Sequence, residues 1–283
     1  INNKKKKRKF IEEWIQDSSI QRKERADVIP PPLYCPPNVL NLWQPSKYEG
    51  KEIELTNERY NKEAVDAWIS HIGIVCDHDA DAIEYNLNWF AHMLQKPAEK
   101  PECCLVLTGE QGSGKTLMLD PIKKIIPGGY FESSTPERDV WGNFNPTMAN
   151  CMLVVLSEID KRNQFGADGK FKALITDKEI TIRNLHQAPY VTRSNHRFII
   201  PTNNSDPIYH EDGQRRFGII KCSNEKKGDK AYFDQFANYW TIDDNLLSLY
   251  SYLMKRDISN WNFRKIPKSS YQQTLESFNR NPL

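Results

Sequence analysis

The chain has 283 residues, of which 39% are hydrophobic and 27% are charged, and its formal net charge at pH 7 is +2. These values are ordinary for a globular protein with one large or two modest domains. No apolar run approaches the roughly 20 residues of a membrane span, and no signal peptide is visible. The six cysteines lack Cys-x-x-Cys spacing, which favours reduced thiols in a cytoplasmic protein over a disulfide framework or a zinc site.

Residues 1–39 are predicted to form a basic and proline-rich linker. Lys4 to Lys9 is an unbroken basic run, and Phe10 to Ile15 can start a helix. The run is either a DNA-contacting arm or a solvated linker, and the second is favoured because charge runs are usually solvated. The prolines between Pro30 and Pro37 predict a stiff extended connector. Because the chain begins at Ile1 rather than Met, we interpret it as part of a longer protein.

Residues 40–100 are predicted to form a small helical domain. Leu40 to Trp43 is interpreted as a hydrophobic peg that docks on the following domain. Between Asn61 and Gln95 large apolar residues recur at helical spacing, among them Val65, Trp68, Ile72, Ile83, Leu87, Phe90 and Leu94. The three histidines of this stretch are predicted to be surface or core residues rather than metal ligands: His71, His78 and His92.

The most specific motif lies in the predicted core, residues 101–224. It fits the phosphate-loop pattern of a Gly, four free positions and Gly-Lys-Ser/Thr, and its predicted nucleotide-binding residues are Gly109, Glu110, Gln111, Gly112, Ser113, Gly114, Lys115 and Thr116. An apolar run, Cys103 to Thr108, predicts a buried parallel strand before it, and Leu117 to Ile126 predicts a helix after it. Lys115 can reach the β- and γ-phosphates of ATP, and the Thr116 hydroxyl can ligate Mg²⁺.

A second apolar run, Asn150 to Asp160, predicts a strand that ends in acidic residues. In phosphate-loop ATPases such a strand lies beside the loop and delivers carboxylates to Mg²⁺ and to the attacking water. Glu158 is therefore the candidate general base and a candidate metal residue. Ser157 occupies the place of the usual metal-side Asp, and Asp160 is a weak substitute for it. The alternative is a buried strand capped by an acid.

A basic hairpin is predicted next, after a short helix from Phe171 to Ile175. Glu179 to Arg183 and Pro189 to Arg193 alternate in polarity around the polar stretch Asn184 to Ala188. Cations beside such a hairpin suit the phosphates of a single DNA strand, and the candidate DNA-binding residues are Lys172, Lys178, Arg183 and His186. A plain surface hairpin is the alternative.

Two further features complete the predicted core. The strand from Arg197 ends in amides at Asn203 and Asn204, and Asn203 is predicted to hold the attacking water and sense the γ-phosphate. Arg215 and Arg216 precede the strand that begins at Phe217. One of these arginines is the candidate finger that reaches a neighbouring subunit's γ-phosphate, and the sequence leaves open which one. Residues 225–283 are predicted to form a helical C-terminal segment.

The motifs follow one another as phosphate loop, acidic strand, basic hairpin, amide-ended strand and paired arginines. With this order, and with Asn88 to Pro97 before it, the chain resembles the superfamily 3 helicases of viruses and mobile elements, which are AAA+ ATPases that form hexameric rings on DNA. It is most similar to the poxvirus-type primase-helicase branch, which occurs in phages as the C-terminal part of primase-polymerases. The resemblance implies an α/β fold with a phosphate-loop core and a parallel sheet, preceded and followed by helical segments.

The resemblance also implies a function. It points to an ATP- and Mg²⁺-dependent DNA helicase module of a viral or phage replication protein, acting in the host cytoplasm as a hexameric ring on single-stranded or forked DNA. A primase or polymerase domain is expected upstream. Ser157 leaves a second hypothesis open, a DNA-holding ring or clamp that supports an attached primase-polymerase with little or no ATP hydrolysis. A metabolic phosphate-loop kinase is a third hypothesis, but it explains neither the hairpin nor the arginines.

Overall fold

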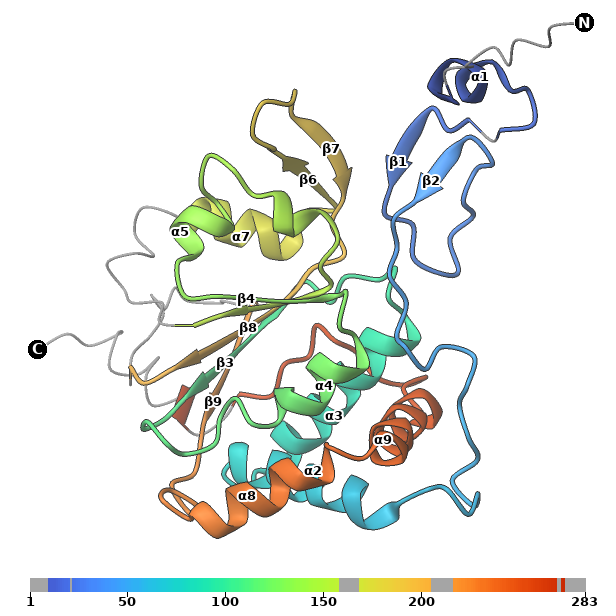
Figure 1. Ribbon diagram of the computed structural model, residues 1–283. Coiled ribbons are helices and arrows are strands. Elements are labelled where there is room, and N and C mark those ends of the chain that lie inside the picture. Colours follow the sequence, from blue (N-terminus) through green and yellow to red (C-terminus); the bar gives the residue numbers. More distant parts are fainter. Residues whose placement is uncertain (1–9, 21, 158–167, 205–215, 269–270, 273–283) are drawn as a thin grey trace, which may run out of the picture.

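A five-stranded parallel sheet lies at the centre of the molecule, between two layers of helices (Figure 1). The computed structural model describes residues 10–20, 22–157, 168–204, 216–268 and 271–272. The strand order is β4-β5-β8-β3-β9, with bounds Tyr130–Ser133 for β4, Leu153–Leu156 for β5, Arg197–Thr202 for β8, Cys104–Thr108 for β3 and Phe217–Lys221 for β9. All neighbouring pairs are parallel. The predicted α/β fold with a parallel sheet is confirmed.

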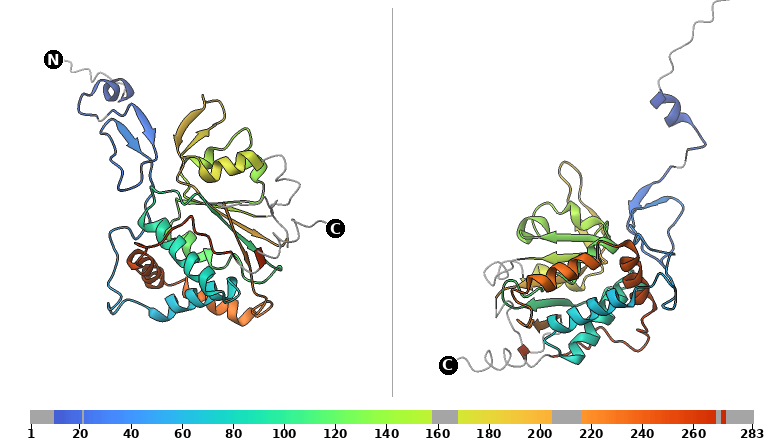
Figure 2. Two further views of the ribbon diagram at one scale, coloured as in Figure 1. Left: turned by 180° about the vertical axis from the view of Figure 1, so that it is seen from behind. Right: turned by 60° about the horizontal axis from the view of Figure 1, so that its bottom comes forward.

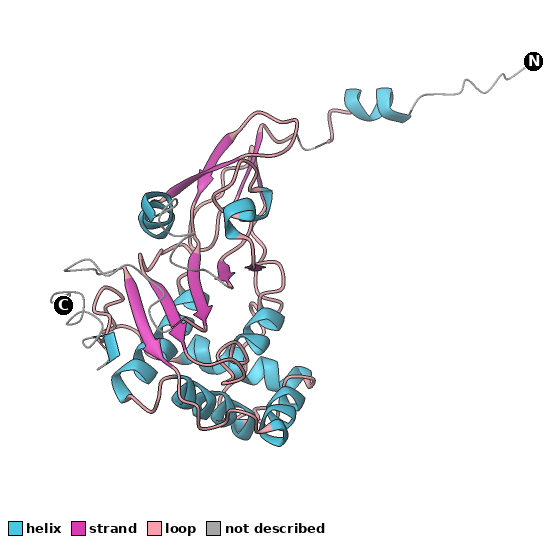
Figure 3. Cartoon of the chain, turned by 90° about the vertical axis from the view of Figure 1, so that its left-hand side faces the viewer, coloured by secondary structure: helices cyan, strands magenta, loops and turns pink. Residues whose placement is uncertain are grey.

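The inner strands are continuous apolar runs because helices cover both faces of the sheet (Figure 3). Every residue of β3, β5 and β8 is buried. Alternate residues of β3 therefore face two different hydrophobic clusters: Leu105 and Leu107 belong to one, and Cys104 and Val106 belong to the other.

One helical layer is built from both ends of the chain. It comprises α2 (Lys62–Val75), α3 (Ala80–Gln95), α4 (Leu119–Ile125), α8 (Lys230–Tyr239) and α9 (Asp243–Lys255), and α9 contacts α2, α3 and α4. The aspartate and asparagine side chains that precede α2, α3 and α8 accept hydrogen bonds from first-turn N–H groups, which satisfies donors that have no partner inside the helix. The predicted helical pattern between Asn61 and Gln95 is confirmed.

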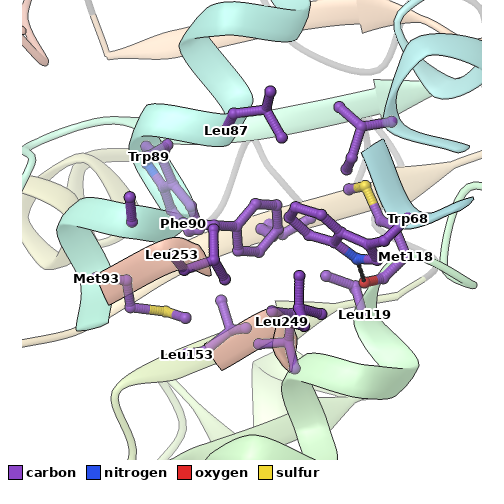
Figure 4. Close-up of a cluster of buried hydrophobic side chains, with 14 of the residues drawn as sticks. Trp68, Leu87, Trp89, Phe90, Met93, Met118, Leu119, Leu153, Leu249 and Leu253 are labelled. Atoms are coloured by element: carbon purple, nitrogen blue, oxygen red, sulfur yellow. Dashed lines mark hydrogen bonds between the residues drawn. The ribbon is translucent and has the colours of Figure 1, made fainter. Parts of the chain in front are cut away.

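Large side chains fill the space between this layer and the sheet (Figure 4). Trp68 of α2 packs edge-on against Phe90 of α3, with 5.5 Å between the ring centroids. The indole Nε1 of Trp68 donates a hydrogen bond of 2.9 Å to the Met118 carbonyl, so this buried donor is satisfied just before α4. Leu249 and Leu253 of α9 complete the cluster. The N-terminal helices and the C-terminal helix thus share one core with the segment that follows the phosphate loop.

The opposite face of the sheet carries shorter elements. These are α5 (Pro136–Asp139), the 3₁₀ helix η1 (Pro146–Ala149), α7 (Asp168–Thr176) and the antiparallel hairpin of β6 (Glu179–Ile182) and β7 (Tyr190–Arg193). Phe171 of α7 contacts Phe198 of β8 at 5.4 Å and Phe217 of β9 at 5.9 Å. The hairpin pattern and the short helix before it are confirmed.

An N-terminal arm extends from this body, as the two views of Figure 2 show. It carries α1 (Phe10–Gln16) and the parallel pair of β1 (Arg25–Asp27) and β2 (Val39–Asn41). The Thr192 hydroxyl of the hairpin donates a 2.8 Å hydrogen bond to Asp27, and Trp43 packs against the core. The segment expected to be only an extended connector therefore pairs as two short strands and touches the hairpin.

Two cations, one fully and one partly buried, tie the start of β8 to both layers. Arg197 is fully buried and donates to the carbonyls of Lys96 and Glu99 at 3.0 Å and 2.6 Å, just after α3. Lys100 donates to the Leu174 carbonyl at 2.5 Å and to the Ser194 hydroxyl at 2.6 Å. Because carbonyl groups at helix C-termini carry partial negative charge, the cations are well placed there.

The structure also bears on disulfides, metal sites and membrane spans. All six cysteines are free thiols. Among the described residues no group of three or more His, Cys, Asp or Glu side chains is placed to hold a metal ion. In the same part of the chain, no helix is both long and apolar enough to cross a bilayer.

The stability of the fold is expected to fall steeply in mild acid. Burial lowers the pKa of His92 and of His196 from 6.5 to about 3 in each case. Above pH 6.5 the two histidines are neutral in the folded and in the unfolded chain. Below pH 6.5 they take up protons only in the unfolded chain. Each histidine therefore removes up to about 1.4 kcal/mol of unfolding free energy per pH unit as the pH falls below 6.5. Urea unfolding at pH 7.5, 6 and 5 measures this slope.

The matched variants isolate the contribution of His92 and His196 to this slope. The double change His92→Gln and His196→Gln should lower the stability at pH 7.5 but flatten its decline toward pH 5. Changing His186, which is exposed, to Gln should leave the slope as it is. If the double variant lost stability toward pH 5 as steeply as the wild type, His92 and His196 would not be the cause of the decline.

Candidate nucleotide and DNA sites

The phosphate loop has the backbone that its glycines predict. It follows β3 directly, and Gly112 and Gly114 have φ angles of +80° and +88°, which side chains with a Cβ rarely adopt. A Cβ on Gly114 would also lie 2.9 Å from Phe233 and 3.0 Å from His71. The helix expected from Leu117 begins only at Leu119, because the residues from Lys115 to Met118 form turns that lead out of the loop.

Lys115 is buried at the centre of the loop. Its Nζ donates to the Gly109 and Glu110 carbonyls at 2.7 Å each, and to the Asn203 side-chain oxygen at 2.9 Å. Burial lowers the pKa of the Lys115 amine, while the three acceptors hold the ammonium in position. The loop, its lysine and the amide that follows β8 therefore meet at one place.

A cavity of about 390 Å³ opens beside this lysine. It lies at the carboxyl ends of β3, β5 and β8, the edge at which parallel α/β sheets bind ligands. Its lining residues come from the loop, the strand ends and α8, and they include Gln111, Thr116, Ser157, Thr202, Asn203 and Phe233. The exposed Thr116 hydroxyl makes no hydrogen bond to any described residue, so an oxygen ligand is free at this wall for a hard cation.

Sequence reasoning missed the support of the loop by two helices outside it. The buried His71 of α2 donates from Nε2 to the Gly114 carbonyl at 3.0 Å. Because that carbonyl only accepts, Nε2 carries the proton, and Nδ1 accepts from the Tyr232 hydroxyl of α8 at 2.8 Å. Burial lowers the pKa of His71, which keeps this ring neutral. No local pattern reveals the contact, since His71 and Gly114 are brought together only by packing.

The acidic strand ends at the cavity but not beside β3. The strand β8 lies between β3 and β5 in the sheet. Ser157 nevertheless lines the cavity, because β5 and β3 end at the same edge of the sheet. Its hydroxyl donates a 3.1 Å hydrogen bond to Glu132 of β4, a residue that the sequence did not single out. Glu158 and Asp160 lie outside the described residues.

The hairpin lies at the other edge of the sheet. The chain passes from β7 to the start of β8 through three residues, whereas the cavity lies at the end of β8. Arg183 and His186 are exposed near the tip, and His186 adopts a positive φ of +59°. Lys178 is exposed just before β6, and Lys172 is half-buried on α7. The structure thus gathers the four candidate DNA-binding residues on α7 and the hairpin, away from the nucleotide cavity.

A hollow of about 470 Å³ extends this hairpin surface. Arg183 and Lys170 line it together with Trp141, whose ring packs 5.7 Å from that of Phe171. Asn145 fixes the neighbouring loop to the hairpin, since its Oδ1 accepts from the Arg183 N–H at 2.8 Å. Phe144 in this loop is 50% exposed. Aromatic faces and cations therefore lie side by side, which is the composition of single-strand binding surfaces.

Arg216 also lies at the hairpin edge of the sheet. Its carbonyl accepts from the Cys104 N–H at 2.7 Å, so Arg216 flanks the first residue of β3, whereas the phosphate loop follows the last. The length of β3 separates them, which is roughly 16 Å for five residues. The guanidinium Nε of Arg216 is buried and has no hydrogen-bond partner among the described residues. Arg215 lies outside the described residues.

Known proteins match this chain over different spans. The family described as a family of unknown function (DUF5906) matches residues 107–216. A DNA primase-polymerase of Nitratiruptor phage NrS-1 is 29% identical over 154 residues, which are 53% of this chain and 21% of that protein. The apo structure of the NrS-1 C-terminal region superposes with a TM-score of 0.74 at 21% identity, covering 91% of this chain and 61% of that one. The A-form apo structure of the same region superposes with a TM-score of 0.74 at 22% identity, covering 90% of this chain and 60% of that one.

The chain is similar to the C-terminal region of a phage primase-polymerase. The resemblance to phage primase-polymerases drawn from the motifs is therefore confirmed. The structural likeness extends through the helices on both sides of the phosphate-loop core, since it covers nine-tenths of the chain. The chain itself spans only about a fifth of the primase-polymerase that it matches.

Proposed function

We propose that this chain is an ATP-dependent DNA helicase module of a phage or viral replication protein that works as a homo-oligomeric ring, with the hexamer as the expected form. The cavity at the phosphate loop carries the proposal, because Lys115 and Asn203 meet there at 2.9 Å although they lie far apart in the sequence. In the nucleotide-bound state the lysine exchanges its loop carbonyls for phosphate oxygens, and Asn203 is then placed beside the terminal phosphate. The similarity to a phage primase-polymerase supports this role and an upstream primase or polymerase domain.

The residues at the cavity fit a magnesium ion as well as a nucleotide. The Thr116 hydroxyl is free at the cavity wall, and hydroxyl and carboxylate oxygens suit Mg²⁺. When bound, Mg²⁺ neutralises charge that develops on the transferred phosphate. In the proposed roles Lys115 binds phosphate, Glu158 orients the attacking water and Arg216 or Arg215 completes the site from a neighbouring subunit.

DNA is proposed to bind at the hairpin edge, on the surface formed by Arg183, His186, Lys178 and Lys172 together with Trp141 and Phe144. Cations hold the phosphates there, and the two exposed or half-exposed rings offer faces for base stacking. Because the hairpin leads into β8 through three residues, and Asn203 follows the end of β8, one strand joins this surface to the nucleotide cavity.

A ring or clamp with little ATP turnover is the second candidate, and Ser157 is the observation that favours it. Steady-state ATP hydrolysis with and without single-stranded DNA separates the two. The motor predicts a turnover that DNA stimulates and that Glu158→Gln abolishes. Binding of ATP and DNA without turnover at saturating ATP and Mg²⁺ would overturn the motor in favour of the clamp.

The hairpin assignment predicts a change in the salt dependence of DNA binding. Changing Arg183 and His186 to Ala should weaken single-strand binding and lower the slope of log affinity against log salt by about 0.7 for each lost phosphate contact. Fluorescence anisotropy with a labelled oligonucleotide at several salt concentrations gives both numbers. The same double change with Arg59 and His78, which are exposed on the helical side of the molecule, is the control. An unchanged slope in the hairpin variant would refute the assignment.

A further inference from the structure

The structure places a carboxylate, that of Glu132, beside Ser157, where the sequence lacks the usual aspartate. Ser157 stands where phosphate-loop ATPases carry the metal-side Asp, and its hydroxyl donates to Glu132 Oε1 at 3.1 Å. The other carboxylate oxygen, Oε2, accepts from the Tyr130 hydroxyl, also at 3.1 Å. Glu132 is thus held from two sides, with one oxygen directed at the wall of the nucleotide cavity.

The strand register places both side chains on the correct face of the sheet. Glu132 is paired with Val155 in the parallel ladder of β4 and β5, so the two side chains point to the same face. Ser157 is two residues beyond Val155 and shares that face. Val155 packs in the same hydrophobic cluster as Ile122 of α4, so this is the face on which the phosphate loop passes into its helix.

Glu132 is exposed, and its link to the cavity is the hydrogen bond from Ser157. No described Lys, Arg or His forms an ion pair with it. Because Ser157 donates its single hydroxyl proton to Glu132, the remaining lone pairs of the serine oxygen act as acceptors, and Ser157 lines the cavity together with Thr116. A serine oxygen polarised by a carboxylate is a stronger acceptor than an isolated serine.

We propose that Glu132 and Ser157 together replace the missing aspartate of the magnesium site. The Ser157 oxygen accepts a hydrogen bond from a water ligand of the ion, and Glu132 is a positioning residue that orients Ser157 and supplies the negative charge. The inference rests on the proposed nucleotide-binding function, and it assigns to β4 a role that the sequence pattern places on β5.

The test measures how strongly nucleotide binding depends on Mg²⁺. Binding of a fluorescent ATP analogue is titrated at several MgCl₂ concentrations for the wild type, Glu132→Gln and Ser157→Ala. Outer-shell partners of metal ligands typically contribute 10- to 100-fold to metal affinity, so both variants should need about ten times more Mg²⁺ for half-maximal binding. Affinity without Mg²⁺ should not fall. Tyr130→Phe removes one of the two bonds to the carboxylate and should give a smaller shift in the same direction.

A rescue distinguishes this role from a structural one. Ser157→Asp restores the usual carboxylate, so in the Glu132→Gln background it should return the Mg²⁺ requirement to the wild-type value. Glu58→Gln, an exposed change away from the cavity, should have no effect. Wild-type Mg²⁺ dependence in Glu132→Gln would overturn the inference and leave the proposed function intact. A wild-type chain that binds no nucleotide at any Mg²⁺ concentration would overturn the proposed function and, with it, the inference.

Discussion

Replacing Lys115 with Ala is expected to abolish productive nucleotide binding. The side chain supplies three hydrogen bonds and a positive charge at the centre of the phosphate loop, and no other described lysine or arginine lines the cavity. Loss of one preorganised donor to a developing charge costs about 10² to 10³ in rate. We expect kcat/KM for ATP to fall by at least about 100-fold, and steady-state hydrolysis with single-stranded DNA present measures it.

Loss of activity through unfolding has to be separated from loss of the phosphate contact. Lys115→Ala removes two bonds to loop carbonyls and one to the Asn203 side chain, while the support of the loop by His71 through the Gly114 carbonyl is retained. The thermal midpoint without nucleotide should therefore change little, and the increase in midpoint that ATP causes in the wild type should vanish. Lys265→Ala, at an exposed position, is the control. If Lys115→Ala bound ATP as tightly as the wild type, the cavity beside Lys115 would not be the ATP site.

Replacing Arg216 with Ala is expected to leave ATP binding intact and to lower ATP turnover by about 10³-fold or more. Arg216 flanks the first residue of β3, and the phosphate loop follows the last. The length of β3 therefore separates it from the nucleotide of its own subunit, and its proposed role is to act on the nucleotide of a neighbour. Fluorescent nucleotide binding and steady-state hydrolysis, measured on the same preparation, give the two quantities.

Mixed oligomers test whether the arginine acts across an interface. Neither Arg216→Ala nor Lys115→Ala should hydrolyse ATP alone, but a mixture forms some interfaces with an intact loop on one side and an intact arginine on the other. Partial recovery of activity is expected on mixing. Arg59→Ala, which removes an exposed ion pair with Asp244 on the helical side, should be active without a partner. Arg215→Ala is tested in parallel, and absence of recovery for both arginines would refute the assignment in trans.

The parts of the site that the sequence predicted are those encoded in short stretches. A phosphate loop is a contiguous segment, so its glycines, Lys115 and Thr116 are recognisable from their spacing, and the positive φ angles of Gly112 and Gly114 follow from the absence of a Cβ. The hairpin is also local, because its two strands are joined by the seven residues 183–189. The same holds for the helical repeat between Asn61 and Gln95.

Contacts between distant segments were not predictable in this way. His71 supports Gly114 from a helix that precedes the core, and Tyr232 completes the contact from a helix that follows it. Glu132 reaches Ser157 because the order of strands places β4 beside β5, and no order of strands was predicted from the sequence. Side chains that meet through packing leave no signal in the spacing of a single sequence.

The sequence by itself therefore determined the chemical groups and the motif order: a phosphate loop, an acidic strand with a serine in place of the usual Asp, a basic hairpin, an amide-ended strand and paired arginines. Only the tertiary structure decided where these groups lie relative to one another. Parallel strands begin at one edge of a sheet and end at the other, so Lys115, Asn203 and Ser157 converge at the carboxyl edge. Arg216 and the hairpin are held at the opposite edge, because Arg216 precedes β9 and the hairpin precedes β8, while the cavity residues follow the parallel strands β3, β5 and β8.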